Sequence, residues 1–244
     1  MSAQKPLIIA HRGAKGMAPE NTLAAFKLGL EQGCHAIELD IHLSADGELI
    51  VCHDDTLDRT TNGKGRIADM TLAEIKKFDA GLWYGEEFRG ETIPTLGEVF
   101  DLVPESIMIN IEVKDHREQK LEPVLVNFLR KRGRTASVVI SSFDHKCLRR
   151  LKQLDPEVKI GLLYQLNLYD PAAYARSLGV EVYSLHPLFK LLDQEEVNKA
   201  LDSGLQVYPW TANEAPELRQ LAELGVSGII TDFPGRLRDL LAQE

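Results

Sequence analysis

Cysteine is scarce in this chain of 244 residues, which contains only Cys34, Cys52 and Cys147. The three positions show no paired spacing, and an odd number of cysteines without a framework is typical of reduced thiols in a reducing compartment. The sequence therefore argues against a small domain held together by disulfides. We expect a cytoplasmic protein, although a mature form that has lost a leader would show the same pattern.

Long apolar runs are also missing near the N-terminus, where MSAQKPLIIAHRG contains one lysine and only the short run LIIA. That run is too short for the core of a signal peptide or for a membrane-spanning helix. We therefore expect no stable association with a membrane.

Positive charge is in deficit, because 28 lysines and arginines stand against 37 aspartates and glutamates, giving a formal net charge of −9. Such a chain lacks the basic surface that nucleic acids and anionic membranes require, so nucleic acid is excluded as a general partner. A small anionic substrate remains compatible, since a metal ion or a single arginine can reverse the field at one site.

What the sequence does contain is a repeated alternation of β-rich runs and helices with apolar residues at three- and four-residue spacing. Strands are predicted at residues 7–10, 36–43, 107–113, 138–142, 159–164, 182–185, 205–210 and 228–231. Helices are predicted at residues 22–32, 96–102, 119–131, 145–154, 171–178, 194–202, 215–223 and 236–241. Several helices end at a glycine suited to a left-handed C-cap, namely Gly33, Gly133, Gly179, Gly204 and Gly225. Asn21 or Thr22 can cap the first helix.

This alternation predicts parallel strands joined by crossovers, and eight such units in about 250 residues match the size of a (β/α)8 TIM barrel. A doubly wound open sheet is the alternative, but no G-x-G-x-x-G follows the first strand. We predict a single catalytic domain over residues 1–244. In a barrel of this kind, catalytic residues lie at the C-terminal ends of the strands.

One region breaks the pattern, because about forty residues separate His53 from Leu96. They form a predicted insertion over approximately residues 55–95 and include DRTTNGKGRIAD and GLWYGEEF. A loop of this length is usually functional or a small subdomain, so a lid over the site and a solvent-exposed insertion are both open. The NGKG segment lacks the spacing of a phosphate-binding loop and predicts turns.

Acidic side chains occur at alternate positions of two predicted strands, which places them on one face. The inward-facing sets are Glu38, Asp40 and His42, and Asn110, Glu112 and Lys114. Glu38, Asp40 and Glu112 would converge, and two unit charges about 4 Å apart repel by roughly 4 kcal/mol at an effective dielectric near 20. Either their pKa values rise or a cation lies among them. Oxygen ligands favour Mg²⁺, Ca²⁺ or Mn²⁺ over zinc, and an ion-pair network with Lys114 and Arg12 is the alternative.

Two histidines are placed to work beside these acids. His11 ends the first strand, and a hairpin through SADGE and LIVCHD would return His53 to the same mouth. Two imidazoles beside a cation suggest an acid–base pair. His42 has a weaker case, and His186 ends a strand without a visible partner. The remaining histidines are predicted to lie at the surface: His35, His116 and His145.

Other strand ends supply candidates for substrate binding. Arg12 can form a bidentate fork to a phosphate or carboxylate, or an ordinary ion pair with Glu20 or Asp54. Trp210, predicted to end the seventh strand, can form the apolar wall of a substrate pocket or belong to the core. Phe143, in VVISSFD, is a similar candidate.

The motifs HRG…PENT, ELD…DGELIVCHD, INIEVK, ISSF, WTAN and GIITDFP occur in this order over nearly the whole chain. The ordered set resembles the glycerophosphodiester phosphodiesterases, most of all the compact bacterial cytoplasmic type. The resemblance implies a (β/α)8 barrel with a small insertion after the second strand. It also implies hydrolysis of glycerophosphodiesters, such as glycerophosphocholine and glycerophosphoethanolamine, to sn-glycerol 3-phosphate and an alcohol.

The resemblance also assigns residues. It implies three metal ligands (Glu38, Asp40 and Glu112), two catalytic histidines (His11 and His53) and two phosphate-binding groups (Arg12 and Lys114). The expected cofactor is a divalent cation, Mg²⁺ or Ca²⁺, with Mn²⁺ as a further option. Ser44 stands where the family more often has threonine, and His42 occupies a variable position of the family.

These residues can catalyse the hydrolysis of a diester with His11 as the base and His53 as the acid, and the reverse assignment is open. The nucleophile is either water or the substrate's own glycerol hydroxyl, which would give a cyclic phosphate. Two other functions remain compatible with the sequence. One is a lysophospholipase D-type enzyme acting on lysolipids, and the other is a non-catalytic barrel that binds phosphodiesters.

Overall fold

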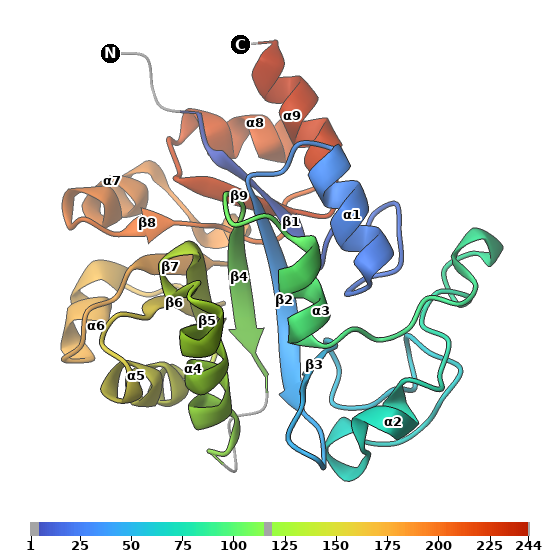
Figure 1. The fold of residues 1–244 in the computed structure, drawn as a ribbon. Coiled ribbons are helices and arrows are strands. Elements are labelled where there is room, and N and C mark those ends of the chain that lie inside the picture. The colour runs from blue at the N-terminus through green and yellow to red at the C-terminus, as the bar shows by residue number, and fades with distance from the viewer. Residues whose placement is uncertain (1–4, 115–118, 244) are drawn as a thin grey trace.

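The computed structural model describes residues 5–114 and 119–243, and within them eight parallel strands form a nearly closed barrel with helices between them (Figure 1). The parallel strands are β1 (Leu7–His11), β2 (Ala36–Leu43), β4 (Met108–Val113), β5 (Val138–Ser142), β6 (Lys159–Tyr164), β7 (Ser184–Pro187), β8 (Gln206–Val207) and β9 (Gly228–Thr231). The fold is therefore the predicted (β/α)8 TIM barrel.

Helices alternate with these strands and cover the outside of the barrel (Figure 1). They are α1 (Leu23–Glu31), α3 (Leu96–Leu102), α4 (Leu121–Arg132), α5 (His145–Leu154), α6 (Pro171–Ser177), α7 (Gln194–Asp202), α8 (Ala215–Glu223) and α9 (Pro234–Ala242). The short helix α2 (Leu72–Ile75) belongs instead to the segment between β3 and α3. Short 3-10 turns are η1 (Ile67–Asp69), η2 (Glu86–Phe88), η3 (Thr135–Ser137) and η4 (Phe189–Leu191). None of the helices in the described part of the chain is long and apolar enough to cross a membrane.

Hydrogen-bonded neighbours follow the order β8-β7-β6-β5-β4-β2-β1-β9. The two ends of this order approach each other, because the Ser227 N–H donates to the Val207 carbonyl and the Ile230 N–H to the Pro209 carbonyl, each at 3.0 Å. The short strand β3 (Leu49–Val51) pairs antiparallel with β2, which confirms the predicted hairpin. This hairpin turns the chain back toward the mouth of the barrel just before His53.

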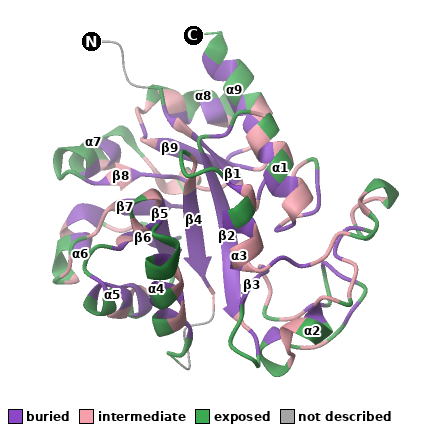
Figure 2. Cartoon of the chain, in the orientation of Figure 1, coloured by how far each residue is buried: buried purple, intermediate pink, exposed green. Residues whose placement is uncertain are grey.

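Alternation along β2 separates the core from the site. Ile37, Leu39 and Ile41 are fully buried and pack in one cluster with helix residues such as Phe26 and Leu96. Burying a side chain of this kind stabilises the fold by about 1.5–3 kcal/mol. The opposite face of β2 points into the barrel, and both β2 and β4 are buried along almost their whole length (Figure 2).

The segment between β3 and α3 is folded around its own small core rather than extended in solvent. Its buried residues include Leu57, Ile67 and Ile75, which pack in one cluster with Ile50 of β3. Helix α2 is capped at Thr71, whose side chain is paired with Glu74 in a capping box. In Figure 1 this insertion lies beside the barrel, next to β3.

Where the boundaries differ from prediction, a local cause is visible. Strand β8 covers Gln206–Val207 instead of 205–210, because Pro209 has no N–H for the ladder. Trp210 thus lies beyond the strand and forms an isolated bridge with Leu188. Helix α4 begins at Leu121 because Gln119 has a positive φ of 56°. Helix α9 begins with Pro234, whose missing N–H costs nothing in a first turn.

Strand β7 also differs from prediction, whereas the helix caps agree with it. Strand β7 covers Ser184–Pro187 rather than 182–185, and we have no physical account of that two-residue shift. Thr22 caps α1 by accepting a hydrogen bond from the Ala25 N–H. All five predicted capping glycines have a positive φ, as a left-handed C-cap requires.

Candidate active site

A cavity of about 190 Å³ opens among the C-terminal ends of the barrel strands. Its wall contains every residue predicted for the site except Asp40. The cavity is also lined by Asn110 and Ser141, from β4 and β5. The position agrees with the rule that barrel chemistry occurs where the strands end.

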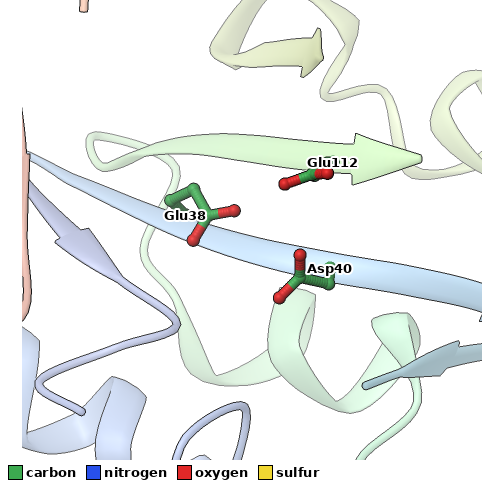
Figure 3. A group of neighbouring side chains, drawn as sticks. All are labelled: Glu38, Asp40 and Glu112. Carbon is green, nitrogen blue, oxygen red and sulfur yellow. The ribbon is translucent and has the colours of Figure 1, made fainter. Parts of the chain in front are cut away.

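The three acids meet because of strand register. Asp40 on β2 is paired with Glu112 on β4, and Glu38 lies two residues earlier on the same inward face. One carboxylate oxygen from each of the three lies within 4.8 Å of the others, and all three residues are buried. Figure 3 shows the three carboxylates gathered beside the two strands.

The cluster carries more negative charge than its protein neighbours compensate. Burial and the charges of Asp40 and Glu112 raise the pKa of Glu38 well above its ordinary value. Burial and Asp40 also raise the pKa of Glu112 to about 7. For Asp40 burial acts upward, but the charges of Lys114 and Arg12 outweigh it and lower the pKa. Without a further cation, the three carboxylates would not all ionise at neutral pH.

Both parts of the predicted ion-pair alternative are present. Lys114 Nζ lies 2.7 Å from Glu112 Oε1 and 3.2 Å from Asp40 Oδ1. Arg12 Nε lies 3.3 Å from Asp40 Oδ2, and the Arg12 backbone N–H donates to Glu38 Oε2 at 3.0 Å. Even so, the buried Asn110 Oδ1 accepts no hydrogen bond, and Asp40 Oδ1 has only its ion pair with Lys114. Buried oxygens with so few donors beside three carboxylates fit a hard divalent cation, so the donor set suits such an ion.

His11 is held by a carboxylate from the far end of the chain. Its Nδ1 lies 2.6 Å from Asp232 Oδ1, just after β9. Burial would raise the pKa of Asp232, but the hydrogen bond from His11 and the charge of Lys15 lower it. An ionised carboxylate only accepts, so Nδ1 carries the proton and Nε2 of the neutral ring is free to accept one. Burial lowers the pKa of His11 to about 4, despite the opposing effect of Asp232.

His53 has a parallel arrangement with its chain neighbour. Its Nδ1 donates to Asp54 Oδ1 at 2.7 Å. Hydrogen bonds from Arg59 lower the pKa of Asp54 to about 2, so this carboxylate too is an acceptor. The backbone carbonyl of His53 accepts a hydrogen bond from His42 Nε2 at 3.1 Å. His42 therefore supports His53 and does not itself line the cavity.

Arg12 is fixed from behind by the loop that follows β1. Its Nη1 donates to Glu20 Oε1 at 2.8 Å, so of the two predicted ion-pair partners the structure brings Glu20 into contact. Asn21, at a positive φ of 57° that asparagine tolerates, donates from Nδ2 to Asp40 Oδ2 at 2.9 Å. The segment PENT thus starts the helix and also orients Arg12 and the carboxylate of Asp40.

An aromatic pair forms one wall of the cavity. Phe143 follows β5, and its ring meets that of Trp210 edge to face with centroids 5.6 Å apart. Trp210 Nε1 donates to the His186 carbonyl at 2.8 Å, which fixes the indole. Both rings lie where an apolar part of a substrate could rest.

The other histidines are now placed. His186 is fully buried and shares a hydrogen bond with Ser184, a partner that the sequence did not reveal. His35 is exposed, as predicted. His145 is partly exposed, and its ring is held by two hydrogen bonds: its Nε2 donates to the Leu163 carbonyl and its Nδ1 accepts from Tyr174. His116 lies outside the described residues.

The sequence interpretation missed Asp232 and Arg59 as parts of this site, and it named Asp54 only as a possible partner of Arg12, not of His53. Asp54 and Arg59 were visible as neighbours of His53 in HDDTLDR, and Asp232 directly follows a strand end in GIITDFP. The rule for barrel strand ends would have singled out Asp232. Its pairing with His11, across 221 positions, follows only from barrel closure.

Comparison with known proteins gives a consistent result. Residues 11–236 match the model of the glycerophosphoryl diester phosphodiesterase family. A glycerophosphodiester phosphodiesterase of Caldanaerobacter subterraneus subsp. tengcongensis is 45% identical over 97% of this chain and 98% of that protein. A glycerophosphodiester phosphodiesterase of Bacillus altitudinis is 39% identical, with 94% and 95% covered.

Solved structures are also similar. The structure of an Oleispira antarctica phosphodiesterase in complex with the product sn-glycerol-3-phosphate has a TM-score of 0.91 at 32% identity. The superposition covers 98% of this chain and 97% of that one.

Proposed function

The chain belongs to the glycerophosphoryl diester phosphodiesterase family and is a phosphodiesterase, and from that premise we propose a specific reaction. The protein hydrolyses glycerophosphodiesters, such as glycerophosphocholine and glycerophosphoethanolamine, to sn-glycerol 3-phosphate and an alcohol. The reaction depends on a divalent cation and uses histidine acid–base catalysis. One observation carries the proposal: three buried carboxylates and two carboxylate-held histidines share one cavity.

The cation would be held by Glu38, Asp40 and Glu112, whose oxygen donors suit Mg²⁺ or Ca²⁺, with Mn²⁺ as a further option. Bound there, it would offset the negative charge that develops on the phosphoryl oxygens. Arg12 and Lys114 line the same cavity and would bind and orient the phosphate of the substrate. The side chains of Arg12 and Lys114 are already held by carboxylates, so they need little reorganisation when the reaction occurs.

The two histidines would divide the proton transfers. His11 Nε2 lies 4.0 Å from Glu38 Oε2, beside the proposed cation site, and its side chain is 12% exposed. We assign it as the base that takes a proton from the nucleophile, either water or the glycerol hydroxyl of the substrate. The side chain of His53 is 31% exposed, nearer to the solvent into which the alcohol departs. We assign it as the acid that protonates the leaving alkoxide.

Phe143 and Trp210 would supply the apolar wall of the substrate pocket. We further propose that residues 1–244 act as one catalytic domain with an insertion at approximately 55–95, and that it works in the cytoplasm. The ligand is a small molecule rather than a nucleic acid or a membrane surface.

A substrate panel tests the proposal. Purified protein with added Mg²⁺, Ca²⁺ or Mn²⁺ is offered glycerophosphocholine, glycerophosphoethanolamine and lysophosphatidylcholine, and products are identified by phosphorus NMR. We expect sn-glycerol 3-phosphate from the first two and its loss in His11→Ala and His53→Ala. Hydrolysis of lysophosphatidylcholine alone would favour the lysolipid reaction instead. Full activity in either histidine variant would refute the assigned roles.

A further inference from the structure

Arg59 connects the insertion to the catalytic histidine. It lies in the turn-rich segment after β3, and its guanidinium spans two carboxylates that belong to different parts of the chain. Nε donates to Asp54 Oδ2 at 2.7 Å and Nη2 to Asp54 Oδ1 at 3.1 Å. Nη1 donates to Glu20 Oε2 at 3.0 Å and Nη2 to Glu20 Oε1 at 2.7 Å. This is a two-sided fork that only arginine can make.

The two carboxylates lead to two functional groups. Asp54 accepts from His53 Nδ1, and Glu20 accepts from Arg12 Nη1 at 2.8 Å. An unbroken chain of charged hydrogen bonds therefore runs from His53 through Arg59 to Arg12. Glu20 has a largely buried side chain, 8% exposed, so this end of the chain is firmly placed.

Without Arg59, the carboxylate of Asp54 would keep its bond to His53 but lose the two bonds that fix its own orientation. Asp54 is half-buried and could then rotate toward solvent, taking His53 Nδ1 with it. Arg12 would be affected less, because Asp40 also holds it. Loss of Arg59 should therefore disturb proton transfer more than phosphate binding.

We propose that Arg59 is a positioning residue that holds His53, through Asp54, in the orientation needed to protonate the leaving group. The inference rests on the proposed function and deepens it. It also gives the insertion a role: the folded segment after β3 delivers a guanidinium to the rim of the site. Removal of a group that orients a metal-bound imidazole typically changes activity about 10- to 100-fold, and we expect an effect on the same scale here.

The choice of leaving group separates a role in proton donation from a merely structural role, because only the first makes the loss of activity depend on whether the leaving group needs a proton. Glycerophosphocholine releases an alkoxide, which needs a proton, whereas a glycerophosphodiester of p-nitrophenol releases a stable phenolate, which does not. We expect Arg59→Ala to lower kcat for glycerophosphocholine about 10- to 100-fold with a small change in KM. The same variant should hydrolyse the nitrophenyl diester at a rate close to that of the wild type.

Arg89→Ala is the matched control. Arg89 lies in the same insertion and forms a two-bond pair with Glu86, at 2.7 and 2.8 Å, away from the cavity. Its side chain is 58% exposed and that of Arg59 is 44% exposed. We expect wild-type kcat on both substrates. Arg59→Lys keeps the positive charge but cannot form the two-sided fork, and it serves as a second variant in case the alanine variant folds poorly. We expect it to recover part of the lost kcat.

A double-mutant cycle with His53→Ala completes the test. If Arg59 acts through His53, Arg59→Ala should cause no further loss of kcat in the His53→Ala background. Additive losses, equal losses on the two substrates, or wild-type kcat in Arg59→Ala would each overturn the inference. None of these outcomes bears on the proposed function. That function is refuted only if the wild-type protein releases no sn-glycerol 3-phosphate.

Discussion

At the scale of single residues, the site depends on how each histidine is oriented. His11 and His53 each donate a hydrogen bond from Nδ1 to a carboxylate, that of Asp232 and that of Asp54, and so each presents Nε2 for chemistry. The same arrangement fixes a tautomer and a ring direction at once. Exchange of their roles would require no rearrangement of these bonds, so the difference between them lies in burial and position.

His186, a fully buried histidine outside the catalytic set, gives a prediction about pH. Burial lowers the pKa of His186 to about 3 in the folded state, whereas the unfolded chain binds a proton near pH 6.5. The unfolded state then holds more protons, and the free energy of unfolding should fall as pH drops from about 6.5 toward 3, by at most about 1.4 kcal/mol per pH unit. Urea unfolding in EDTA at several pH values measures this contribution.

His186→Asn is the comparison for that measurement, because it removes the titrating ring. We expect a shallower fall in the free energy of unfolding below pH 6.5 than in the wild type. An identical pH dependence in the two proteins would mean that His186 carries no such cost in the folded state.

Prediction from sequence succeeded for residues whose position follows from alternation. Glu38, Asp40 and Glu112 could be placed on one inward face because a strand has a side-chain period of two. Asp232 could not be paired with His11, because that contact depends on how the last strand closes against the first. The roles of Glu38, Asp40 and Glu112 as metal ligands and of His11 in catalysis are proposals.

At the scale of elements, the turn between β1 and α1 positions His11 and Arg12, and Gly13 makes that turn possible. Gly13 has a φ of 82°, and a Cβ built there would lie 2.5 Å from the backbone carbon of Ala25 in α1. Replacement by alanine would thus force the strand end away from the helix that packs against it.

Two glycine variants separate the causes. Gly179 also has a positive φ, of 68°, but nothing lies within 4 Å of a Cβ added there. Gly179→Ala should therefore cost only the strain of alanine in the left-handed conformation, about 1–2 kcal/mol. We expect Gly13→Ala to reduce the free energy of unfolding by clearly more than that, in urea titrations, and to lower activity as well. Equal destabilisation of the two variants would show that the contact with α1 is easily relaxed.

Element boundaries were predictable where one residue type decides them. The five capping glycines and the cap at Thr22 were read correctly, since their effect is local. The end of β8 was predicted wrongly, because the apolar run LQVYPW suggested a longer strand although Pro209 interrupts it. The folded core of the insertion was not predictable, because its residues come from scattered, turn-rich segments.

At the scale of the whole molecule, the repeated strand–helix pattern predicted the barrel, and the barrel in turn explains why distant motifs share one cavity. The chain carries a net charge of −9, yet Arg12 and Lys114 face the mouth. The acidic cluster beneath them has the opposite sign. The central claim is that this cluster holds a divalent cation on which hydrolysis depends.

The most direct test is the rate of sn-glycerol 3-phosphate release from glycerophosphocholine before and after treatment with EDTA, with Mg²⁺, Ca²⁺ or Mn²⁺ then added back. Glu38→Gln is measured beside Glu195→Gln, an exposed acid on α7 that pairs with Lys199. We predict that EDTA abolishes release, that at least one of the ions restores it, and that only Glu38→Gln raises the ion concentration required. An undiminished rate in EDTA, with no response to any of the three ions, would contradict the account.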